Sequence, residues 1–469
     1  MGDSVRLKHI YVKKLFNRFT YDIDLENGND IAILIAPNGC GKTTILRMIN
    51  FIFSPSIPTY KYISKLPFET FQCTLSNGNC IGLEKKFKRN KKRESNAERN
   101  LLSALSDVDD EYTVDEEKSL IMFINEGKKK HTLDLSSEVE SIRDSLLDFT
   151  DEDMLRSYKY LRSYISEYSS KSDSTEAEIQ RLSLRLKRIV KSFRGEHGSD
   201  MNLLFITADR LHSFVATSRS RNMKAHNMDY PVRSNPLEQI QDEFRDYYKK
   251  THAEYSRKMS DAKDSLPQMY LHRDKSKIMP YEEFSREWED YVSDIEKYYR
   301  LGLIDSAKPI LDSNEMERVY SKNSEFLSVY LRAFKDTLSP WAEKYQEMKL
   351  FVDILNHRNR ITHKVIKYSS NGLVVSDGDN VLNIGSLSSG EKNDLIMFYN
   401  LIFNTDKVNL VLVDEPEISL HIEWQEEYLD RLIEICKMNN FQSVVATHSP
   451  NIINGHFELY AERGLQYEG

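Results

Sequence analysis

The stretch that decides the fold is IAILIAPNGCGKTT, which spans residues 31–44. Its first five residues are apolar and have the length of a buried strand, and a loop of small residues follows at once. Glycines let consecutive backbone N–H groups converge on phosphate oxygens, while the start of the next helix adds its positive dipole end. The sequence therefore predicts a strand, a phosphate loop and a helix between residues 8 and 48.

Each side chain of this loop has an expected task. Lys42 would neutralise the β- and γ-phosphates of a nucleotide, and Thr43 would coordinate Mg²⁺. Ala36 replaces the first glycine of the usual motif, which reduces backbone freedom but leaves the loop small enough to bind. An ordinary glycine turn before a helix is the alternative for the motif taken alone. The residues expected to bind the nucleotide are Asn38, Gly39, Cys40, Gly41, Lys42, Thr43 and Thr44.

Two adjacent carboxylates end a second apolar run. Residues 409–413 indicate a buried strand, and Asp414 and Glu415 follow it directly. We expect Asp414 to hold Mg²⁺ through its water shell and Glu415 to polarise the attacking water as the catalytic base. Taken alone, two acids in a strand-ending turn can also be structural.

Small residues open a helical pattern about twenty residues before these carboxylates. At such a helix start, the hydroxyl of Ser388 and the N–H of Gly390 would bind a γ-phosphate. The same residues also form an ordinary N-cap, so the pattern alone leaves both interpretations open. The residues expected to contact nucleotide here are Ser388, Ser389, Gly390 and Glu391.

His448 ends a further apolar run, VVAT, at residues 444–447. A neutral imidazole in this place can donate or accept a hydrogen bond near a γ-phosphate and so sense its presence. A lone histidine is more often structural. We therefore expect a catalytic role for His448 only in combination with the other motifs.

Composition restricts the class of protein. The 469 residues are 40% hydrophobic and 29% charged, with a net charge of −8 and a mean hydropathy of −0.57. The apolar runs are too short to cross a bilayer, and the N-terminus lacks the pattern of an export signal, so we expect a cytoplasmic protein. Four cysteines without a CxxC pair argue against a disulfide framework or a structural metal.

The chain is predicted to have three parts. Residues 1–150 would form the first lobe of an ATPase head, and residues 351–469 the second lobe. Residues 151–350 would form a helical insertion that contains one head strand near 203–210. Asn77-Gly78 predicts a hairpin with a type I′ turn between two strands. A heptad seam of about two repeats indicates a short coiled coil; its members are Ile179, Leu182, Leu186, Ile189 and Phe193, with Ile240, Phe244 and Tyr247 as the partner seam.

Together, the four motifs resemble the Walker A loop, the signature, the Walker B strand and the switch histidine of the ABC ATPase superfamily. The resemblance implies ATP and Mg²⁺ as cofactors and a slow hydrolysis of ATP to ADP and phosphate. In that superfamily the signature of one head contacts the ATP held by another head. The resemblance therefore implies a homo-oligomer built from head-to-head dimers.

The spacing of the motifs narrows this resemblance. More than three hundred residues, largely of helical pattern, separate Thr44 from Leu387. This arrangement is similar to the SMC and repair ATPases, whose heads are split by a coiled coil. The expected fold class is thus α/β, an ABC-type ATPase head split by a long helical insertion with a short coiled coil.

A closer resemblance covers nearly the whole chain. The segments 205–211, 387–398, 414–421 and 446–454 resemble ATPase subunits of bacterial anti-phage systems, first PARIS and next Septu. This resemblance implies a sensor and scaffold that sequesters a toxic TOPRIM nuclease and releases it on detecting a phage protein; in Septu the nuclease is of HNH type. It also implies that Asp209 stands in place of a glutamine near the metal.

The resemblance leaves a second function open. The chain stops about twenty residues after His448, without room for a TOPRIM domain, so we expect any cleavage to belong to a partner. The alternative is a DNA-repair or DNA-tethering ATPase of SMC type, in which the basic run 85–93 binds phosphates. That run would otherwise bind an acidic protein, such as a phage DNA mimic, or form a solvated tip.

Overall fold

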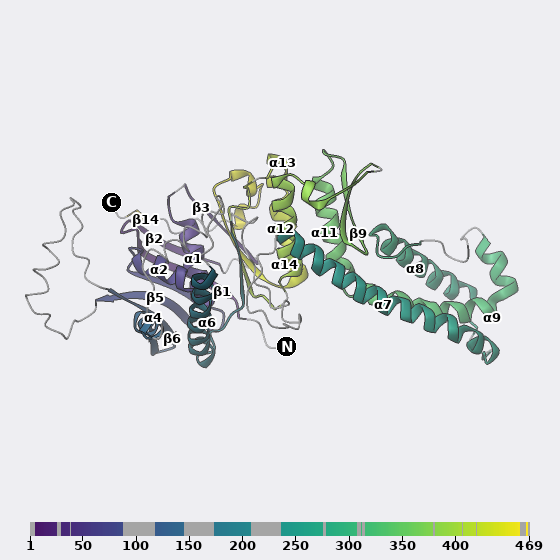
Figure 1. Ribbon diagram of the computed structural model, residues 1–469, viewed down its shortest axis with the longest axis horizontal. Helices are drawn as coiled ribbons and strands as arrows, with labels where there is room; N and C mark the ends of the chain where they lie inside the picture. The colour runs from purple at the N-terminus through teal and green to yellow at the C-terminus, as the bar shows by residue number, and fades with distance from the viewer. Residues whose placement is uncertain are drawn as a thin grey trace, which may run out of the picture. The chain divides into compact units, whose positions relative to one another are not determined.

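The computed structural model describes the chain in two compact units. Unit 1 combines Met1–Ala208 with Thr405–Gly469, and unit 2 is Asp209–Asn404. Figure 1 labels their helices and strands. The residues described are 5–25, 30–37, 39–87, 118–144, 173–207, 236–274, 278–306, 311, 315–378, 380–405, 407–418, 420–459 and 466–467.

An antiparallel sheet forms one layer of unit 1. Its strand order is β14-β2-β1-β4-β5-β6-β7. Burial alternates along strands such as β4, so that one face of the sheet meets the core, as expected for an antiparallel sheet. The strands are β1 (Leu7–Leu15), β2 (Phe19–Asp24), β4 (Thr70–Leu75), β5 (Cys80–Phe87), β6 (Lys118–Glu126), β7 (Lys129–Asp134) and β14 (Gln466–Tyr467).

A parallel sheet carries the predicted motifs. Its order is β3-β13-β12-β8, formed by Ile31–Ile35, Gln442–Thr447, Leu410–Asp414 and Leu203–Ile206. Every residue of β12 and β13 is buried, which explains their continuous apolar sequences. Because the strands are parallel, their carboxyl ends meet at one edge, where the phosphate loop, the double carboxylate and the histidine follow.

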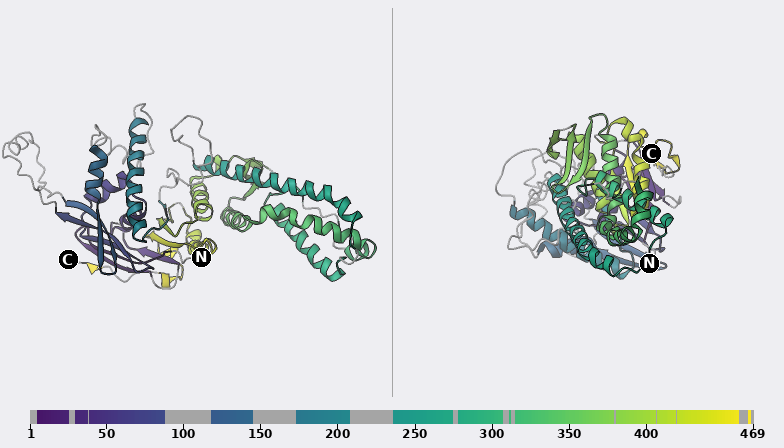
Figure 2. Two further views of the ribbon diagram at one scale, coloured as in Figure 1. Left: turned by 90° about the horizontal axis from the view of Figure 1, so that it is seen from below. Right: turned by 90° about the vertical axis from the view of Figure 1, so that its right-hand side faces the viewer.

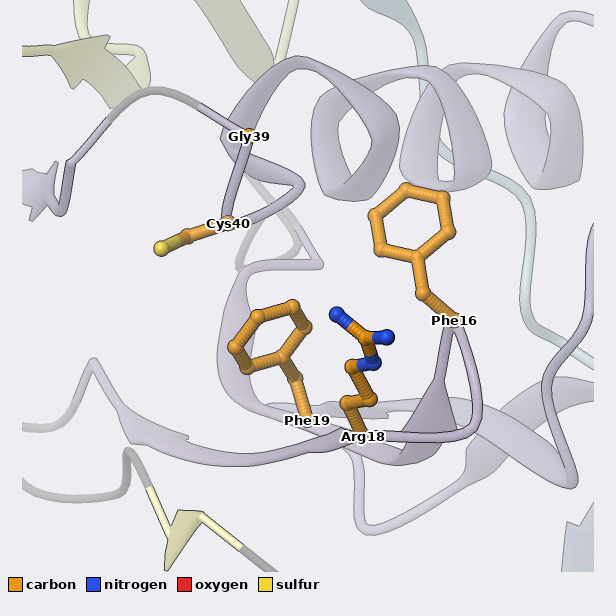
Figure 3. Close-up of a pocket in the computed structure, with 5 residues that line it drawn as sticks. All are labelled: Phe16, Arg18, Phe19, Gly39 and Cys40. Atoms are coloured by element: carbon orange, nitrogen blue, oxygen red, sulfur yellow. The ribbon is translucent and has the colours of Figure 1, made fainter. Parts of the chain in front are cut away.

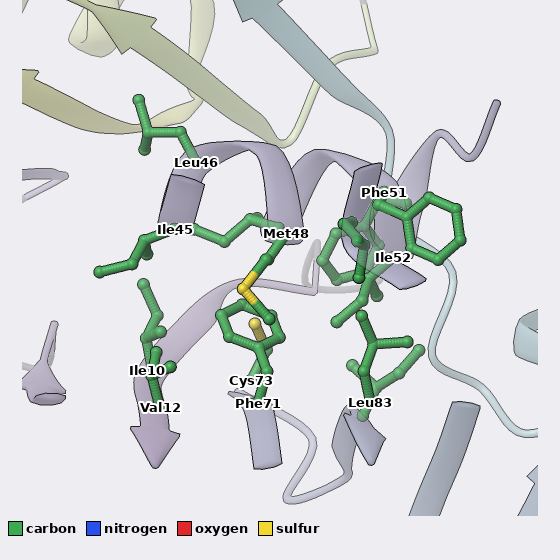
Figure 4. Packing of buried hydrophobic residues seen from close by; sticks show 14 of the residues in the cluster. Ile10, Val12, Ile45, Leu46, Met48, Phe51, Ile52, Phe71, Cys73 and Leu83 are labelled. Carbon is green, nitrogen blue, oxygen red and sulfur yellow. The ribbon is translucent and has the colours of Figure 1, made fainter. Parts of the chain in front are cut away.

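Helix α1 (Lys42–Phe53) joins the phosphate loop to the core of unit 1. Figure 4 shows its side chains Ile45 and Met48 packed over β1 and β4, where Val12 and Phe71 are buried. Chain segments far apart in sequence thereby fix the loop at the helix start. The other helices of unit 1 are α2 (Ile57–Lys65), α4 (Leu135–Asp144), α6 (Asp173–Glu196), α13 (Ile422–Glu426), α14 (Tyr428–Asn439), η6 (Pro450–Ile452) and η7 (Phe457–Leu459).

Unit 2 is mainly helical. In the views of Figures 1 and 2 the long helix α7 runs beside α9, and the two helices are in contact. A small antiparallel sheet has the order β11-β10-β9, with strands Asn380–Leu382, Gly372–Asp377 and Lys364–Ser369. The helices are α7 (Pro236–Leu271), α8 (Tyr281–Arg300), α9 (Met316–Phe334), η4 (Lys335–Leu338), α10 (Ser339–Ala342), α11 (Tyr345–Arg358), η5 (Ile384–Ser386) and α12 (Ser389–Phe403).

The predicted α/β fold class is confirmed: unit 1 combines two sheets with helices, and a long, mainly helical segment interrupts its chain. The two units nevertheless divide the chain differently from the three predicted ranges. Strand β8 belongs to the parallel sheet of unit 1, while α12 packs on α7 and α11 in unit 2. No helix of the described ranges is long and apolar enough to cross a membrane.

The predicted coiled-coil pairing is wrong. Leu182 and Leu186 of α6 are buried in the core of unit 1, where they belong to the same cluster as α1. Phe244 of α7 instead packs on aromatic rings of unit 2, with ring centroids 5.7 Å from Phe351 and 5.2 Å from Phe403. A heptad pattern shows that one helix face is buried, but it does not specify which surface covers it. The side chain of Ile179 lies outside the described ones.

Two local features differ from what the sequence pattern alone indicates. The hairpin at β4–β5 forms, but its turn is not type I′, since Gly78 has a positive φ of 86° and Asn77 does not. The N–H of Gly78 donates to the carbonyl of Leu75 at 3.0 Å, so the loop has three residues with glycine last. Although proline usually interrupts a helix, α7 continues through Pro267 in an exposed stretch near its end. Solvent can satisfy the carbonyl that proline leaves free there.

Candidate functional site

The phosphate loop requires glycine at one position for two reasons. Gly41 has φ 90° and forms the N-cap of α1. A Cβ atom there would lie 2.7 Å from Leu15 Cδ2 and 3.0 Å from Phe16 Cε2, so any side chain would collide with the strand beneath. The loop can therefore keep its tight entry into α1 only with glycine at this position.

Lys42 lies curled over this loop. Its buried ammonium group donates hydrogen bonds to the carbonyls of Ala36 and of Pro37, the latter at 3.2 Å. These carbonyls hold the cation at the place where the phosphate loop would receive an anion. The hydroxyl of Thr44 hydrogen-bonds the hydroxyl of Tyr62 on α2 at 2.9 Å. Its backbone N–H is then the group left for a phosphate.

The structure brings two predicted metal ligands together. Thr43 Oγ1 donates a hydrogen bond of 2.9 Å to Asp414 Oδ1, across 371 positions of sequence. Burial raises the pKa of Asp414 to about 6, with the neighbouring charge of Glu415 adding to the effect and the Thr43 hydrogen bond opposing it. A hydroxyl and a carboxylate are oxygen donors of the kind Mg²⁺ prefers, and a cation would relieve the buried charge. These residues therefore fit Mg²⁺.

Glu415 follows at a strained position. Its φ of 46° lies in the left-handed region, which is uncommon for a residue with a side chain. Its N–H donates to the carbonyl of Ala446 on β13 at 2.8 Å, which holds the backbone there. The carboxylate of Glu415 is partly exposed at the edge of the sheet where Asp414 lies. His448 Nδ1 is 3.8 Å from Glu415 Oε1, so the predicted base and histidine are neighbours.

Glu417 lies beside His448, and the sequence had suggested no role for it. It is buried, and its Oε1 accepts hydrogen bonds from the Thr447 hydroxyl at 2.7 Å and the His448 N–H at 2.9 Å. The same oxygen lies 3.2 Å from His448 Nδ1. A third carboxylate just after Asp414 and Glu415 was a visible signal. Its carboxylate orients the imidazole and would direct its other nitrogen to the site.

A cavity of about 450 Å³ adjoins the phosphate loop. Figure 3 shows Phe16 and Arg18 of the β1–β2 turn and Phe19 at the start of β2 facing Gly39 and Cys40 of the loop. The two phenyl rings meet edge to face, with centroids 6.5 Å apart. Aromatic faces and a guanidinium are suited to a planar ring system.

The predicted signature lies in unit 2 at the start of α12. Ser388 is its N-cap: its hydroxyl oxygen accepts from the Glu391 N–H at 3.2 Å, and its own N–H donates to Glu391 Oε2 at 2.7 Å. Although burial opposes this, hydrogen bonds from Lys364 and from Ser388 lower the pKa of Glu391. The expected N-cap is thus present, while Ser388 and Ser389 stay exposed with a hydroxyl hydrogen left to donate.

Some predicted residues have other environments or lie outside the described ranges. Asn38 and Asp209 belong to the latter, as do residues 88–93 of the basic run. Lys85, at the start of that run, donates a hydrogen bond of 2.8 Å to the carbonyl of Ser64. Lys86 forms an ion pair of 2.8 Å with Glu84. These two lysines therefore already have partners within the chain.

Comparison with known proteins gives one family and a set of solved structures. The model of the AAA ATPase domain family matches residues 14–453. An Smc head domain from Pyrococcus furiosus, with an extended coiled coil and bound to the C-terminal domain of ScpA, is 13% identical, with 96% of this chain and 91% of that chain covered and a TM-score of 0.32. An SMC head domain from Thermotoga maritima is 11% identical with the same coverages and a TM-score of 0.29. The search of curated proteins gave no match.

Proposed function

Because the chain belongs to the AAA ATPase domain family, we propose that unit 1 binds ATP with Mg²⁺ and that a second copy of the chain completes the site for hydrolysis. The observation that carries this proposal is the hydrogen bond between Thr43 and Asp414. It places a phosphate-loop hydroxyl and a buried carboxylate within reach of one cation. Bound there, Mg²⁺ would neutralise charge on the phosphates.

The remaining groups of unit 1 then have distinct tasks. Lys42 would exchange its two loop carbonyls for the β- and γ-phosphates. Glu415 would accept a proton from the attacking water, since its carboxylate is partly exposed at the strand end. His448, held by Glu417, would contact the γ-phosphate. The aromatic cavity beside the loop would hold the base.

The second copy would supply the signature. Ser388 and Ser389 are exposed at the N-terminus of α12, where the helix dipole favours an anion. A γ-phosphate held on one chain would thus receive the Ser388 hydroxyl and the Gly390 N–H of the other chain. The expected assembly is a homo-oligomer built from head-to-head dimers.

Removal of the Lys42 ammonium tests whether this loop binds the nucleotide. Lys42→Ala should weaken ATP binding by about 10- to 100-fold, because it removes a charged hydrogen-bond donor from the phosphates. Lys65→Ala, at an exposed lysine of α2, is the matched control and should bind as the unaltered chain does. Isothermal calorimetry with a non-hydrolysable ATP analogue measures both. Equal affinity for the two variants would contradict the assignment of the loop.

On the wider role, we propose an anti-phage sensor and scaffold in the cytoplasm that holds a separate nuclease inactive until it meets a phage protein. The resemblance of segments 205–211, 387–398, 414–421 and 446–454 to ATPase subunits of anti-phage systems supports this choice, whereas the order and spacing of the motifs also suit the SMC-type alternative. DNA tethering has less support, because Lys85 and Lys86 of the basic run have internal partners. An acidic trigger, such as a DNA mimic, would be bound by the rest of that run.

Co-expression with the product of the adjacent gene tests this role. A TOPRIM nuclease that co-purifies and is released on phage infection supports the PARIS-like assignment, and an HNH nuclease supports the Septu-like one. The Lys42→Ala chain should fail to release the nuclease. Binding of duplex DNA that falls steeply with salt, without any nuclease partner, would instead support the SMC-type alternative.

A further inference from the structure

Two histidines and one glutamate, side chains of the kinds that can bind transition metals, lie together in unit 1. The ATPase mechanism gives none of them a role. Glu126 ends β6, His131 lies in β7, and His197 follows the last residue of α6. One donor atom from each lies within 4.8 Å of the other two. Glu126 Oε2 is 3.7 Å from His131 Nε2 and 3.9 Å from His197 Nδ1. The imidazole rings stack with centroids 3.9 Å apart.

The backbone fixes the direction of these side chains. Ile124 pairs with His131 across the β6–β7 hairpin, and Glu126 lies two residues after Ile124 on the same strand. All three therefore lie on one face of the sheet, the face on which Ile124 is fully buried. The segment after α6 is fixed separately, because Asn79 Nδ2 donates to the carbonyl of His197 at 2.8 Å. Phe193 packs edge-on against the His197 ring at 5.3 Å.

The two histidines and Glu126 lie close enough to share an ion, yet Glu126 is not within hydrogen-bond distance of either ring. Both His–Glu separations exceed hydrogen-bond length, and His131 Nε2 is buried without a hydrogen-bond partner in the described chain. Donors about 2.0 Å from a tetrahedral zinc ion stand about 3.3 Å apart. The two His–Glu separations exceed this by about 0.4 and 0.6 Å, and His131 Nε2 lies within 4.8 Å of His197 Nδ1. Because the two imidazole rings stack nearly parallel, a bound ion requires the rings as well as the exposed Glu126 side chain to turn.

We propose that Glu126, His131 and His197 bind one Zn²⁺ ion, with water in a fourth position. Two imidazoles and one carboxylate suit zinc, whereas Mg²⁺ and Ca²⁺ select oxygen donors. The ion would join the β6–β7 hairpin to the end of α6, whose chain continues into β8 beside the strand of Asp414. It stabilises unit 1 and takes no part in the hydrolysis of ATP. The cysteines, on which the sequence expectation against a structural metal rested, are not involved.

Calorimetry on the full chain, stripped of metal by a chelator, tests this site. Zn²⁺ should bind at one ion per chain and raise the melting temperature, and Co²⁺ should give the visible bands of a four- or five-coordinate ion. Glu126→Gln should weaken binding about 10- to 100-fold, and His131→Ala with His197→Ala at least as much. The control is His9→Ala, which removes a half-buried histidine paired with Asp22 on another strand, and this variant should bind zinc normally.

Either of two results would overturn the proposal: no bound ion in the unaltered chain, or equal zinc affinity in the unaltered chain and Glu126→Gln. Glu126 is half exposed, so its substitution leaves the fold intact and decides the question even where the double histidine variant is unstable. ATP binding by each variant, measured in parallel, verifies that unit 1 is folded. If Asp414 or His448 held the ion instead, Glu126→Gln would bind zinc with unchanged affinity. That result would also contradict the assignment.

Discussion

The edge of unit 1 at Asp414 and the start of α12 in unit 2 differ in how their polar groups are satisfied. At Asp414 a buried carboxylate has the Thr43 hydroxyl as its partner, and burial raises its pKa. At α12 the capping box satisfies the helix start internally, and Ser388 and Ser389 are exposed. Unit 1 therefore holds groups that would favour a cation, while the described start of α12 in unit 2 presents exposed hydroxyl groups. This contrast is what the proposed composite site requires.

Substitution of Glu415, the proposed catalytic base in unit 1, should reduce ATP turnover the most. Glu415→Gln keeps the size of the side chain but cannot accept a proton, so ATP turnover should fall by about 10²- to 10⁴-fold while ATP binding persists. Oligomers with trapped ATP should accumulate in size-exclusion chromatography. Glu423→Gln, at an exposed position of α13, is the control and should hydrolyse normally. Unchanged turnover in Glu415→Gln would rule out this residue as the base.

Burial of the Asp414 carboxylate predicts that the folded protein becomes less stable as pH rises. Its folded pKa of about 6 lies above the ordinary 3.8, so the unfolded chain loses this proton first as pH rises from 4 to 6. Stability should fall through that window and remain lower above it, by about 3 kcal/mol. Asp414→Asn removes this penalty and should therefore stabilise the nucleotide-free protein at pH 8, while it abolishes Mg²⁺-dependent hydrolysis.

Denaturant unfolding at two pH values checks this expectation. Below the pKa of the unfolded carboxyl, at about pH 3.5, the variant and the unaltered chain should be equally stable. At pH 8 the variant should unfold at higher denaturant concentration. An Asp414→Asn chain that is less stable at pH 8 would show that the carboxylate is stabilised, not destabilised, by its surroundings.

A smaller loss of turnover is expected from substitution of Glu417, the residue that would orient His448. Glu417→Gln replaces a charged acceptor beside His448 by an amide, so turnover should fall about 10- to 100-fold with little change in ATP affinity. Since both residues act as a unit, adding Glu417→Gln to His448→Ala should cause no further loss. Additive losses in this double-mutant cycle would show that Glu417 acts by a separate route.

The smallest effect on stability belongs to the exposed signature. Ser388→Ala removes the N-cap of α12 and should lower the free energy of unfolding by about 1 kcal/mol. It should also reduce turnover, because the hydroxyl donor is lost, while ATP binding to unit 1 stays unchanged. Ser386→Ala removes a nearby exposed hydroxyl that bonds the Asn383 carbonyl, and it serves as the control for turnover. Equal turnover in both variants would remove Ser388 from the site.

The sequence predicted the parts of the site that depend on local pattern. A buried strand ending in a charged residue is visible in one run of letters, and parallel strands bring such ends to one edge, as Asp414 and His448 show. What covers a helix face is not local: Leu186 and Phe244 belong to different units although both lie in apolar seams. Glu417 had no predicted role because its partners, Thr447 and His448, come from another strand.

The most direct test of the account mixes two inactive chains. Lys42→Ala removes the phosphate contact of unit 1, and Ser388→Arg places a bulky cation at the exposed helix N-terminus of unit 2, where the dipole disfavours it. Each chain alone should be inactive. An equal mixture should recover about a quarter of the ATPase activity, because half of the two-fold dimers carry one intact composite site. No recovery on mixing, or full activity of Ser388→Arg alone, would contradict the claim that two chains complete each ATP site.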